Sequence, residues 1–185
     1  MRKSGFSLLE VLVVLALLVV LLSLAAPELL GFRQLHQMQS RAEHLQSSLM
    51  LARSEALRRQ QRVTVCVRQD NLANVPIDDC DQAGTWDQGW VVFVDVNDNA
   101  LRDGSETVLL VQTALPDFLS LKGNATVDRY VSYGPEGRSQ SKTDAFQAGT
   151  LTLCASGQAH VWRVVINAIG KPRLEKTKRL TTSNC

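Results

Sequence analysis

An apolar segment with one carboxylate near its start is the feature that most constrains how this chain folds. From Phe6 to Ala26 almost every residue is apolar, yet Glu10 stands directly after the leucines that open the run. A carboxylate at the centre of a bilayer costs roughly 2.5 kcal/mol or more, and such residues usually mark function. The segment therefore needs an interpretation in which Glu10 is useful.

Two common interpretations leave the carboxylate unexplained. In an ordinary secretory signal, Arg2 and Lys3 supply the charges, residues 8–22 the apolar core and residues 23–25 a small-residue cleavage site. In a plain single-span anchor, the run that ends at Pro27 is about long enough to cross a bilayer. Neither has a use for an acidic side chain.

A third interpretation gives the carboxylate a role. If the chain is cut after Gly5, Phe6 becomes the N-terminus, and Glu10 lies four residues on, one helical turn away. A carboxylate near a helix N-terminus is favoured by the helix dipole and neutralises an amine, its own or a neighbour's. In a bundle of such helices, this pairing would fix the axial register of the subunits.

The stretch KSGFSLLE, residues 3–10, resembles the class III signal of type IV pilins and type II secretion pseudopilins. In that family a prepilin peptidase cuts after the glycine and methylates the new N-terminal phenylalanine. The resemblance thus implies a leader over residues 1–5, cleavage after Gly5 and methylation of Phe6. It also implies that residues 6–27 form a transmembrane helix that later enters a filament core, where Glu10 pairs with a neighbouring subunit.

Pro27 resembles the proline that kinks the pilin helix, and the pattern after it is still helical. From Leu35 to Ala56 apolar residues recur at alternating steps of three and four, which predicts a helical stripe. A coiled coil and a helix packed on its own sheet both fit such a stripe. Its three alanines favour the second, and we assign residues 28–62 to the amphipathic half of one long N-terminal helix.

After Arg62 the apolar period changes to two, which predicts short strands. Glycine, asparagine and proline separate them. A long helix followed by strands is an α+β architecture, here a type IV pilin-like helix packed on an antiparallel β-sheet in a globular domain over residues 63–185. The predicted strands are 63–67, 90–94, 108–111, 130–133, 150–154 and 160–166.

Three further stretches resemble the FimT/GspH branch of minor pilins and pseudopilins. They are ARSEALRRQQRVTVC at residues 52–66, WDQGWVVFVD at residues 86–95 and YGPEGRS at residues 133–139. Together with the signal, they extend the resemblance over most of the chain. The fold known for this branch, a pilin-like helix with a globular β domain, agrees with the pattern of the residues.

Composition and cysteine usage fit one exported domain. The 185 residues, 45% hydrophobic and 21% charged, are typical of a folded protein, and a net charge of +2 argues for no partner by itself. The cysteines have no zinc-like spacing, and their even number beside an export signal favours disulfides. Of the three connectivities that four cysteines allow, we predict the sequence-local pairs Cys66–Cys80 and Cys154–Cys185.

Catalysis has little support in the sequence. His36 and His44 lie on the predicted helix and His160 at a predicted strand, without a nucleophile motif or paired carboxylates around them. We therefore predict that the chain is not an enzyme and needs no cofactor.

The stretch DVNDNALRDGSE, residues 95–106, is a weak calcium candidate. Its polar residues match positions 1, 3, 5, 9 and 12 of an EF-hand loop, but Ala100 stands where the sharp turn normally requires glycine. Asn and Asp also cluster in hairpin loops that hold no metal, so a metal site is not favoured. The candidate ligands are Asp95, Asn97, Asn99, Asp103 and Glu106.

The C-terminal stretch GKPRLEKTKRL, residues 170–180, is basic, with Glu175 as its single acid. A solvated charged strand or tail and a phosphate-binding segment both fit such a run. In competence-linked FimT proteins a Gly-Arg-x-Arg motif in this region binds DNA, and Gly170, Lys171 and Arg173 match it, with lysine in place of the first arginine. The remaining candidate DNA contacts are Lys176, Lys178 and Arg179.

The resemblance implies a minor pilin of a bacterial type IV pilus that helps to initiate assembly near the filament tip. The alternatives are a pilus-associated receptor for DNA uptake and a pseudopilin of a type II secretion system. The implied partners are a prepilin peptidase, other minor and major pilins, the inner-membrane assembly platform and, for the receptor, DNA. The implied location is the inner membrane, with one span and the C-terminal domain in the periplasm, and then the extracellular pilus.

Overall fold

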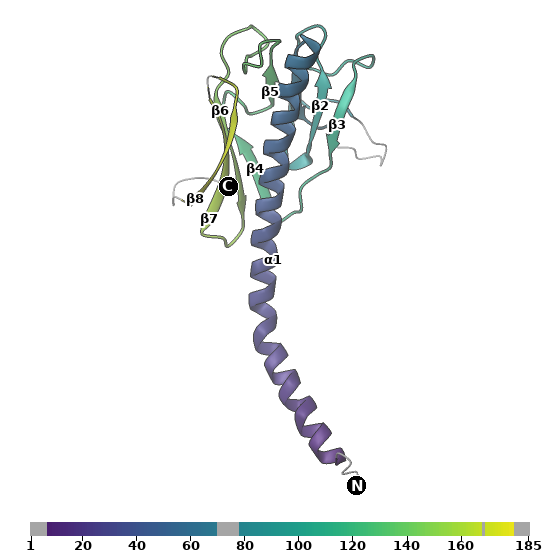
Figure 1. The fold of residues 1–185 in the computed structure, drawn as a ribbon, viewed down its shortest axis with the longest axis vertical. Helices are drawn as coiled ribbons and strands as arrows, with labels where there is room; N and C mark the ends of the chain where they lie inside the picture. Colours follow the sequence, from purple (N-terminus) through teal and green to yellow (C-terminus); the bar gives the residue numbers. More distant parts are fainter. Residues whose placement is uncertain (1–6, 70–77, 168, 180–185) are drawn as a thin grey trace. The chain divides into compact units, whose positions relative to one another are not determined.

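The computed structural model describes residues 7–69, 78–167 and 169–179, with residues 24–30 described by their backbone alone. A long helix, α1, spans Leu8–Arg59 and contains 52 residues. The chain divides into two compact units, Met1–Gln37 and Met38–Cys185. The second unit holds the later part of α1 together with the described strands (Figure 1).

The first sheet of the second unit is four-stranded and antiparallel, in the order β3-β2-β1-β5. Both inner strands are buried along their whole length, which explains why they consist of near-continuous apolar runs. A short 3-10 helix, η1 (Trp86–Gln88), leads into β2. The strands are β1 (Val63–Val67), β2 (Trp90–Val94), β3 (Val108–Gln112) and β5 (Tyr130–Tyr133).

The second sheet is also four-stranded and antiparallel, in the order β4-β6-β7-β8. Its last strand is an edge strand, held in register with β7 from the pair His160 and Lys178 to the pair Ile166 and Pro172. The strands are β4 (Leu119–Gly123), β6 (Gly149–Ala155), β7 (His160–Ile166) and β8 (Pro172–Lys178).

The stripe on α1 packs within its own unit. Met38, Ala42, Leu45, Leu49, Ala52 and Ala56 are all buried, whereas Leu35, in the first unit, is half-buried. Burial of six stripe positions within one chain confirms the prediction that the helix packs on its own domain. On the other side of the first sheet, Cys66, Val91 and Phe93 form a smaller cluster with Cys80, Val108 and Tyr130.

The helix ends at Arg59, three residues before the predicted end at residue 62. Gln60 adopts a left-handed conformation with φ of 55°, which ends helices at this position. Its side-chain amide donates to the carbonyl of Leu57 at 2.7 Å. At the other end of the predicted range, α1 continues through Pro27, and the kink predicted there remains a prediction.

The fold class is the predicted one, but three expectations were incomplete or wrong. The strands form two sheets rather than one. Strand β4 (Leu119–Gly123) was not predicted, although Leu119 and Leu121 alternate as a half-buried strand requires. The sequence of the basic stretch allowed a charged strand or a tail, and residues Pro172–Lys178 form a strand, β8, because pairing with β7 supplies the hydrogen bonds that composition alone does not reveal.

Candidate functional site

The start of α1 is organised around Ser7, which stands directly before the first helical residue. Its hydroxyl accepts a hydrogen bond from the backbone N–H of Glu10 at 3.2 Å, the contact of a helix N-cap. The sequence signal for this cap, Ser-x-x-Glu before an apolar run, was present but overlooked. The helix therefore begins two residues after Phe6, which lies outside the described residues together with Gly5.

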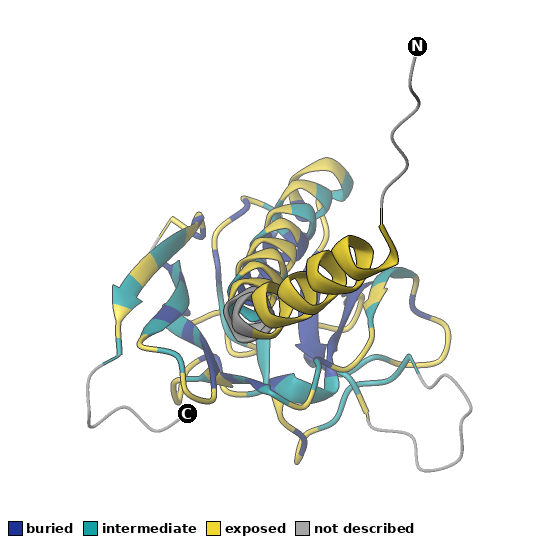
Figure 2. Ribbon diagram, turned by 90° about the horizontal axis from the view of Figure 1, so that it is seen from below, coloured by how far each residue is buried: buried dark blue, intermediate teal, exposed yellow. Residues whose placement is uncertain are grey.

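Apolar side chains project to solvent from the opening part of α1. Between Leu8 and Leu22 the large apolar residues range from 46% exposed at Leu18 to 81% at Leu8, and Figure 2 shows this part of the helix in yellow throughout. A helix that is apolar all round is normally buried in a membrane or a larger assembly. Within the part of the chain that the structure describes, however, no helix is long and apolar enough to cross a membrane.

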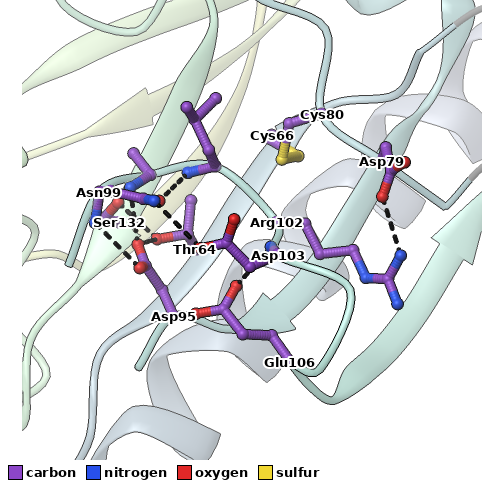
Figure 3. Close-up of a disulfide and its surroundings, with 12 residues drawn as sticks. Thr64, Cys66, Asp79, Cys80, Asp95, Asn99, Arg102, Asp103, Glu106 and Ser132 are labelled. Carbon is purple, nitrogen blue, oxygen red and sulfur yellow. Dashed lines mark hydrogen bonds and ion pairs between the residues drawn. A yellow bond between two sulfur atoms is a disulfide. The ribbon is translucent and has the colours of Figure 1, made fainter. Parts of the chain in front are cut away.

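The acidic loop between β2 and β3 is closed by its own hydrogen bonds (Figure 3). Asp95 is buried, and its carboxylate accepts hydrogen bonds from the Thr64 hydroxyl at 2.8 Å and from the backbone N–H groups of Asn99 and Ala100. Burial raises the pKa of Asp95, while these donors and the charge of Arg62 act in the opposite direction. The buried carboxylate thus fixes the first half of the loop.

Glu106 fixes the second half of the loop. Its two carboxylate oxygens accept the backbone N–H groups of Val96 at 2.7 Å and Asp103 at 2.9 Å. Asp103 in turn accepts the side-chain amides of Asn97 and Asn99. The five calcium candidates are therefore brought together, but their oxygens are occupied by protein donors.

A metal site gains no support from this geometry. Among the residues that the structure describes, no group of three or more His, Cys, Asp and Glu side chains could hold a metal ion. Ala100, which occupies the glycine position of an EF-hand loop, adopts a left-handed φ of 60°. The loop therefore makes its sharp turn without glycine, stabilised by the bond from the Ala100 N–H to Asp95.

Arg62 joins this loop to a second one, and sequence reasoning missed it. Its side chain is 2% exposed and donates to Asp98 at 2.8 Å, to the carbonyl of Ser141 at 2.7 Å and to Asp144 at 2.6 Å. Beside it lies an open hollow of about 450 Å³, lined among others by Gln60, Asp95 and Glu136. Each of the three guanidinium nitrogens of Arg62 has a protein acceptor, so we assign this residue a structural role.

The predicted Cys66–Cys80 disulfide is present, with a Cα–Cα distance of 5.6 Å. It links β1 to the segment around Cys80, where Asp79 also accepts a hydrogen bond from Arg102 at 2.8 Å (Figure 3). Cys154 is buried on β6. Its predicted partner, Cys185, lies outside the described residues, so that pairing remains a prediction.

The basic stretch is divided between two faces of the second sheet. Successive side chains of a strand point to opposite faces of the sheet. Arg173 and Glu175 therefore share one face of β8, and Lys176 and Lys178 share the other. Arg173 forms an ion pair with Glu175. The structure thus separates the predicted motif residue Arg173 from the lysines that follow it.

The glycine of the predicted motif has a structural reason to be there. Gly170 adopts φ of 77°, and a Cβ at this position would lie 2.7 Å from the backbone nitrogen of Ser139 and 2.8 Å from the carbonyl oxygen of Gly137. Only glycine fits such a turn without strain. Lys171 follows it and is exposed.

The far end of the stretch has a different environment. The ammonium of Lys176 lies 5.8 Å from the centroid of the Trp162 ring, a cation–π contact. Lys178 is exposed opposite His160, and the backbone N–H of Arg179 donates to the carbonyl of Ala159 at 2.8 Å. Trp162 was not predicted as part of this site, because its partner becomes apparent only from the register of β7 and β8.

The histidines are not brought together. In the first unit, the ring of His36 packs edge-on against Phe32, with 4.3 Å between the ring centroids. His44 is exposed on α1, and His160 lies on β7. Within the described ranges, they belong to no group of three or more His, Cys, Asp and Glu side chains that could hold a metal ion.

Comparison with known families and structures gives consistent matches. A family model described as type II transport protein GspH matches residues 41–170, and one described as the prokaryotic N-terminal methylation motif matches residues 1–26. No curated protein matches the chain.

Two solved structures have the same fold. The type IV minor pilin FimU of Pseudomonas aeruginosa is 20% identical, with a TM-score of 0.56, and the match covers 78% of this chain and 92% of that one. The minor pseudopilin EpsH from the type II secretion system of Vibrio cholerae is 17% identical, with a TM-score of 0.50, and the match covers 75% of this chain and 93% of that one.

Proposed function

Because this chain belongs to the GspH family of minor pilins and pseudopilins, we propose that it is a minor pilin of a bacterial type IV pilus, helping to initiate assembly near the tip. The observation that carries the proposal is the run of exposed apolar side chains from Leu8 to Leu22, within the segment that matches the N-terminal methylation motif. Such a surface needs a cover. The inner membrane supplies it before assembly, and the apolar core of a filament supplies it afterwards.

The helix start has one environment before assembly, the membrane, and another afterwards, the filament. We propose that the helix is stored as a single span with the second unit in the periplasm, where an oxidising environment suits the Cys66–Cys80 disulfide. In the filament, the carboxylate of Glu10 pairs with the N-terminal amine of a neighbouring subunit. The Ser7 cap leaves that carboxylate available, because the cap uses the backbone N–H of Glu10 rather than its side chain.

The proposed partners follow from this cycle. A prepilin peptidase removes residues 1–5 and methylates Phe6, the assembly platform extracts the helix, and other minor and major pilins surround it. We assign the chain no catalytic role, since the exposed apolar helix and the closed hydrogen bonds of its loops are those of a structural subunit.

Intact-mass analysis of the membrane-extracted protein tests the proposal. We expect loss of residues 1–5 and the gain of one methyl group, and replacement of Gly5 by a bulky residue should leave uncut precursor. Cleavage near Ala25 would instead identify an ordinary secretory signal and overturn the proposal.

The alternative assignment, a pseudopilin of a type II secretion system, predicts a different phenotype. We expect deletion of the gene in its own bacterium to reduce surface pili and to leave protein secretion unchanged. Restoration of pili by the wild-type gene is the control. Lost secretion with normal piliation would favour the pseudopilin.

DNA binding is a second candidate, favoured by exposed Lys171 and Arg173 at the edge of the second sheet. If the chain contacts only the phosphates, the affinity of the full chain in detergent for DNA would be independent of the DNA sequence and would fall steeply with salt concentration. Changing Lys171 and Arg173 together to Ala should reduce the salt slope by about two contacts. Lys122→Ala, at the opposite edge of the same sheet, is the matched control. A flat anisotropy titration at two salt concentrations would exclude this candidate.

A further inference from the structure

The exposed lysines of β8 lie at the end of the second unit where α1 enters it. Gly170, before β8, is packed against Gly137, whose carbonyl accepts a hydrogen bond from Arg53 at 2.8 Å. The strand then begins at Pro172, whose carbonyl accepts a hydrogen bond from Gln46 at 3.3 Å. From Arg53 to Gln46 the path runs backwards along the helix, towards Met38.

The rest of β8 continues in the same direction. The seven residues of the strand from Pro172 to Lys178 span roughly 20 Å. Lys176 and Lys178 therefore lie near the level at which Met38 begins the unit, and Figure 1 shows the end of β8 at the height of the lower turns of α1 in that unit. We call Lys176, Lys178 and Arg179 the proximal cations.

The proximal cations differ in position from two other exposed lysines of the unit, Lys142 and Lys171. Lys142 lies in the loop whose Ser141 carbonyl and Asp144 carboxylate bind Arg62, beyond the end of α1, and Lys171 follows Gly170 near Gly137. These two distal lysines lie towards the opposite end of the unit. The chain therefore carries an internal control for any ligand that approaches from one end.

The chemistry around the proximal cations fits a lipid headgroup layer. Lys176 and Lys178 are exposed, and the half-buried Trp162 lies under the ammonium of Lys176. Lysine and tryptophan are the residues that anchor proteins at membrane interfaces, since both combine an apolar body with a polar end. Arg179 lines a hollow of about 200 Å³ that Asp117 also lines.

Chain connectivity allows this end to reach a bilayer. Pro27 ends the apolar run and Met38, eleven positions later, begins the second unit, so the chain connecting them is short. The headgroup region extends several Å beyond the hydrocarbon on each side. Long lysine side chains extend the reach of the second unit further.

We propose that the proximal cations bind the phosphates of anionic phospholipid headgroups while the subunit is stored in the inner membrane. This inference rests on the proposed membrane storage of α1. A lipid surface is favoured over nucleic acid, because the cations gather at the end where the helix enters and lie without a series of aromatic rings for stacked bases. Contact of this kind would restrain the second unit at the bilayer until assembly extracts the helix.

Lysine acetylation of the full chain in lipid nanodiscs tests the proposal. The reactivity of each lysine is measured by peptide mass spectrometry in phosphatidylcholine discs and in discs that also contain phosphatidylglycerol. We expect the anionic lipid to slow acetylation of Lys176 and Lys178 about fivefold, the population factor for one lysine attracted to such a surface. Lys142 and Lys171 should keep their reactivity, and high salt should abolish the protection.

Variants connect the protection to the charges. Lys176→Gln should weaken the protection of Lys178, whereas Lys171→Gln, the same change at a distal site, should leave it unchanged. Equal reactivity of Lys178 in both kinds of disc would overturn the proposal. Protection by duplex DNA in phosphatidylcholine discs, without protection by phosphatidylglycerol, would overturn it in favour of nucleic acid.

Retention in the disc is measured separately by size-exclusion chromatography. A chain that leaves the disc would contradict the proposed membrane storage itself. A chain that stays but shows no lysine protection would contradict only the headgroup contact.

Discussion

The indole N–H of Trp90 donates a hydrogen bond to the hydroxyl of Ser48 across 2.9 Å, and both side chains are buried. The bond joins the packed face of α1 to β2, an inner strand of the first sheet. The Ser48 hydroxyl also donates to the carbonyl of His44 at 2.9 Å. This pair therefore fixes the height of the helix on the sheet as well as closing the core.

Removing the Ser48 hydroxyl should be costly for its size. We expect Ser48→Ala to lower the free energy of unfolding by about 1–3 kcal/mol, because the Trp90 N–H would be buried without an acceptor. Chemical unfolding of the full chain in detergent, followed by tryptophan fluorescence, measures this, since all three tryptophans lie in the second unit. Ser54→Ala, whose exposed hydroxyl bonds only within the helix, is the control and should change stability by less than about 0.5 kcal/mol.

Glu10 should matter for incorporation into filaments and not for the helix start. We expect Glu10→Gln to insert into membranes normally but to enter filaments tenfold less or worse, since leaving a buried charge unpaired costs about 3–5 kcal/mol. Immunoblotting of sheared filaments against whole membranes measures the ratio. Ser7→Ala removes the cap at a cost of about 1 kcal/mol but keeps the carboxylate, so it should still be incorporated. Normal incorporation of Glu10→Gln would contradict the pairing.

The Cys66–Cys80 disulfide should contribute measurably to stability. Its sequence separation of 14 closes a short loop, for which chain entropy gives about 3 kcal/mol. We expect the double change of Cys66 and Cys80 to Ala to lower the free energy of unfolding by about that amount. Non-reducing peptide mapping should find the same pair in the wild type, and a peptide joining Cys66 to Cys154 would contradict this connectivity.

The buried Asp95 should give the protein a pH dependence of definite sign. Burial raises its pKa above the ordinary value of 3.8, so the folded state binds this proton more tightly than the unfolded state does. The contribution of Asp95 to the free energy of unfolding is therefore greatest at low pH, and it falls as the pH rises from about 4 through the raised pKa. Relative to the wild type, Asp95→Asn should gain stability as pH rises from 3.5 to 7.

The same unfolding measurement in detergent, repeated across that range, checks the sign. Asp103→Asn changes an exposed carboxylate of the same loop, and it serves as the control. A difference between wild type and Asp95→Asn that is independent of pH would contradict the raised pKa.

Much of the fold could be predicted because periodicity records burial. The positions of α1 that face the sheets recur at steps of three and four, and β1 and β2 are apolar throughout because both their faces are covered. Strand β8 could not be predicted in this way. Its sequence PRLEKTK has little apolar content, and its conformation is set by pairing with β7.

The candidate sites were predictable in location more than in chemistry. The spacing of Asp95 and Glu106 correctly places both in one loop, but only the structure reveals that their oxygens accept backbone N–H groups. Residue spacing carries no information on the direction in which a carboxylate points. Arg62 illustrates the same limit, since its partners Asp98 and Asp144 are distant in sequence and become neighbours only through folding.

The position of the Ser7 cap has a consequence for maturation. Ser7 belongs to the part of the chain that would remain after the proposed cleavage at Gly5, so the mature subunit would keep this cap on the first turn of α1. Precursor and mature subunit would then start their helices at the same residue. Processing would change only the charge and length of the N-terminal end of the chain. Each apolar side chain would keep its depth in the lipid while the prepilin peptidase acts.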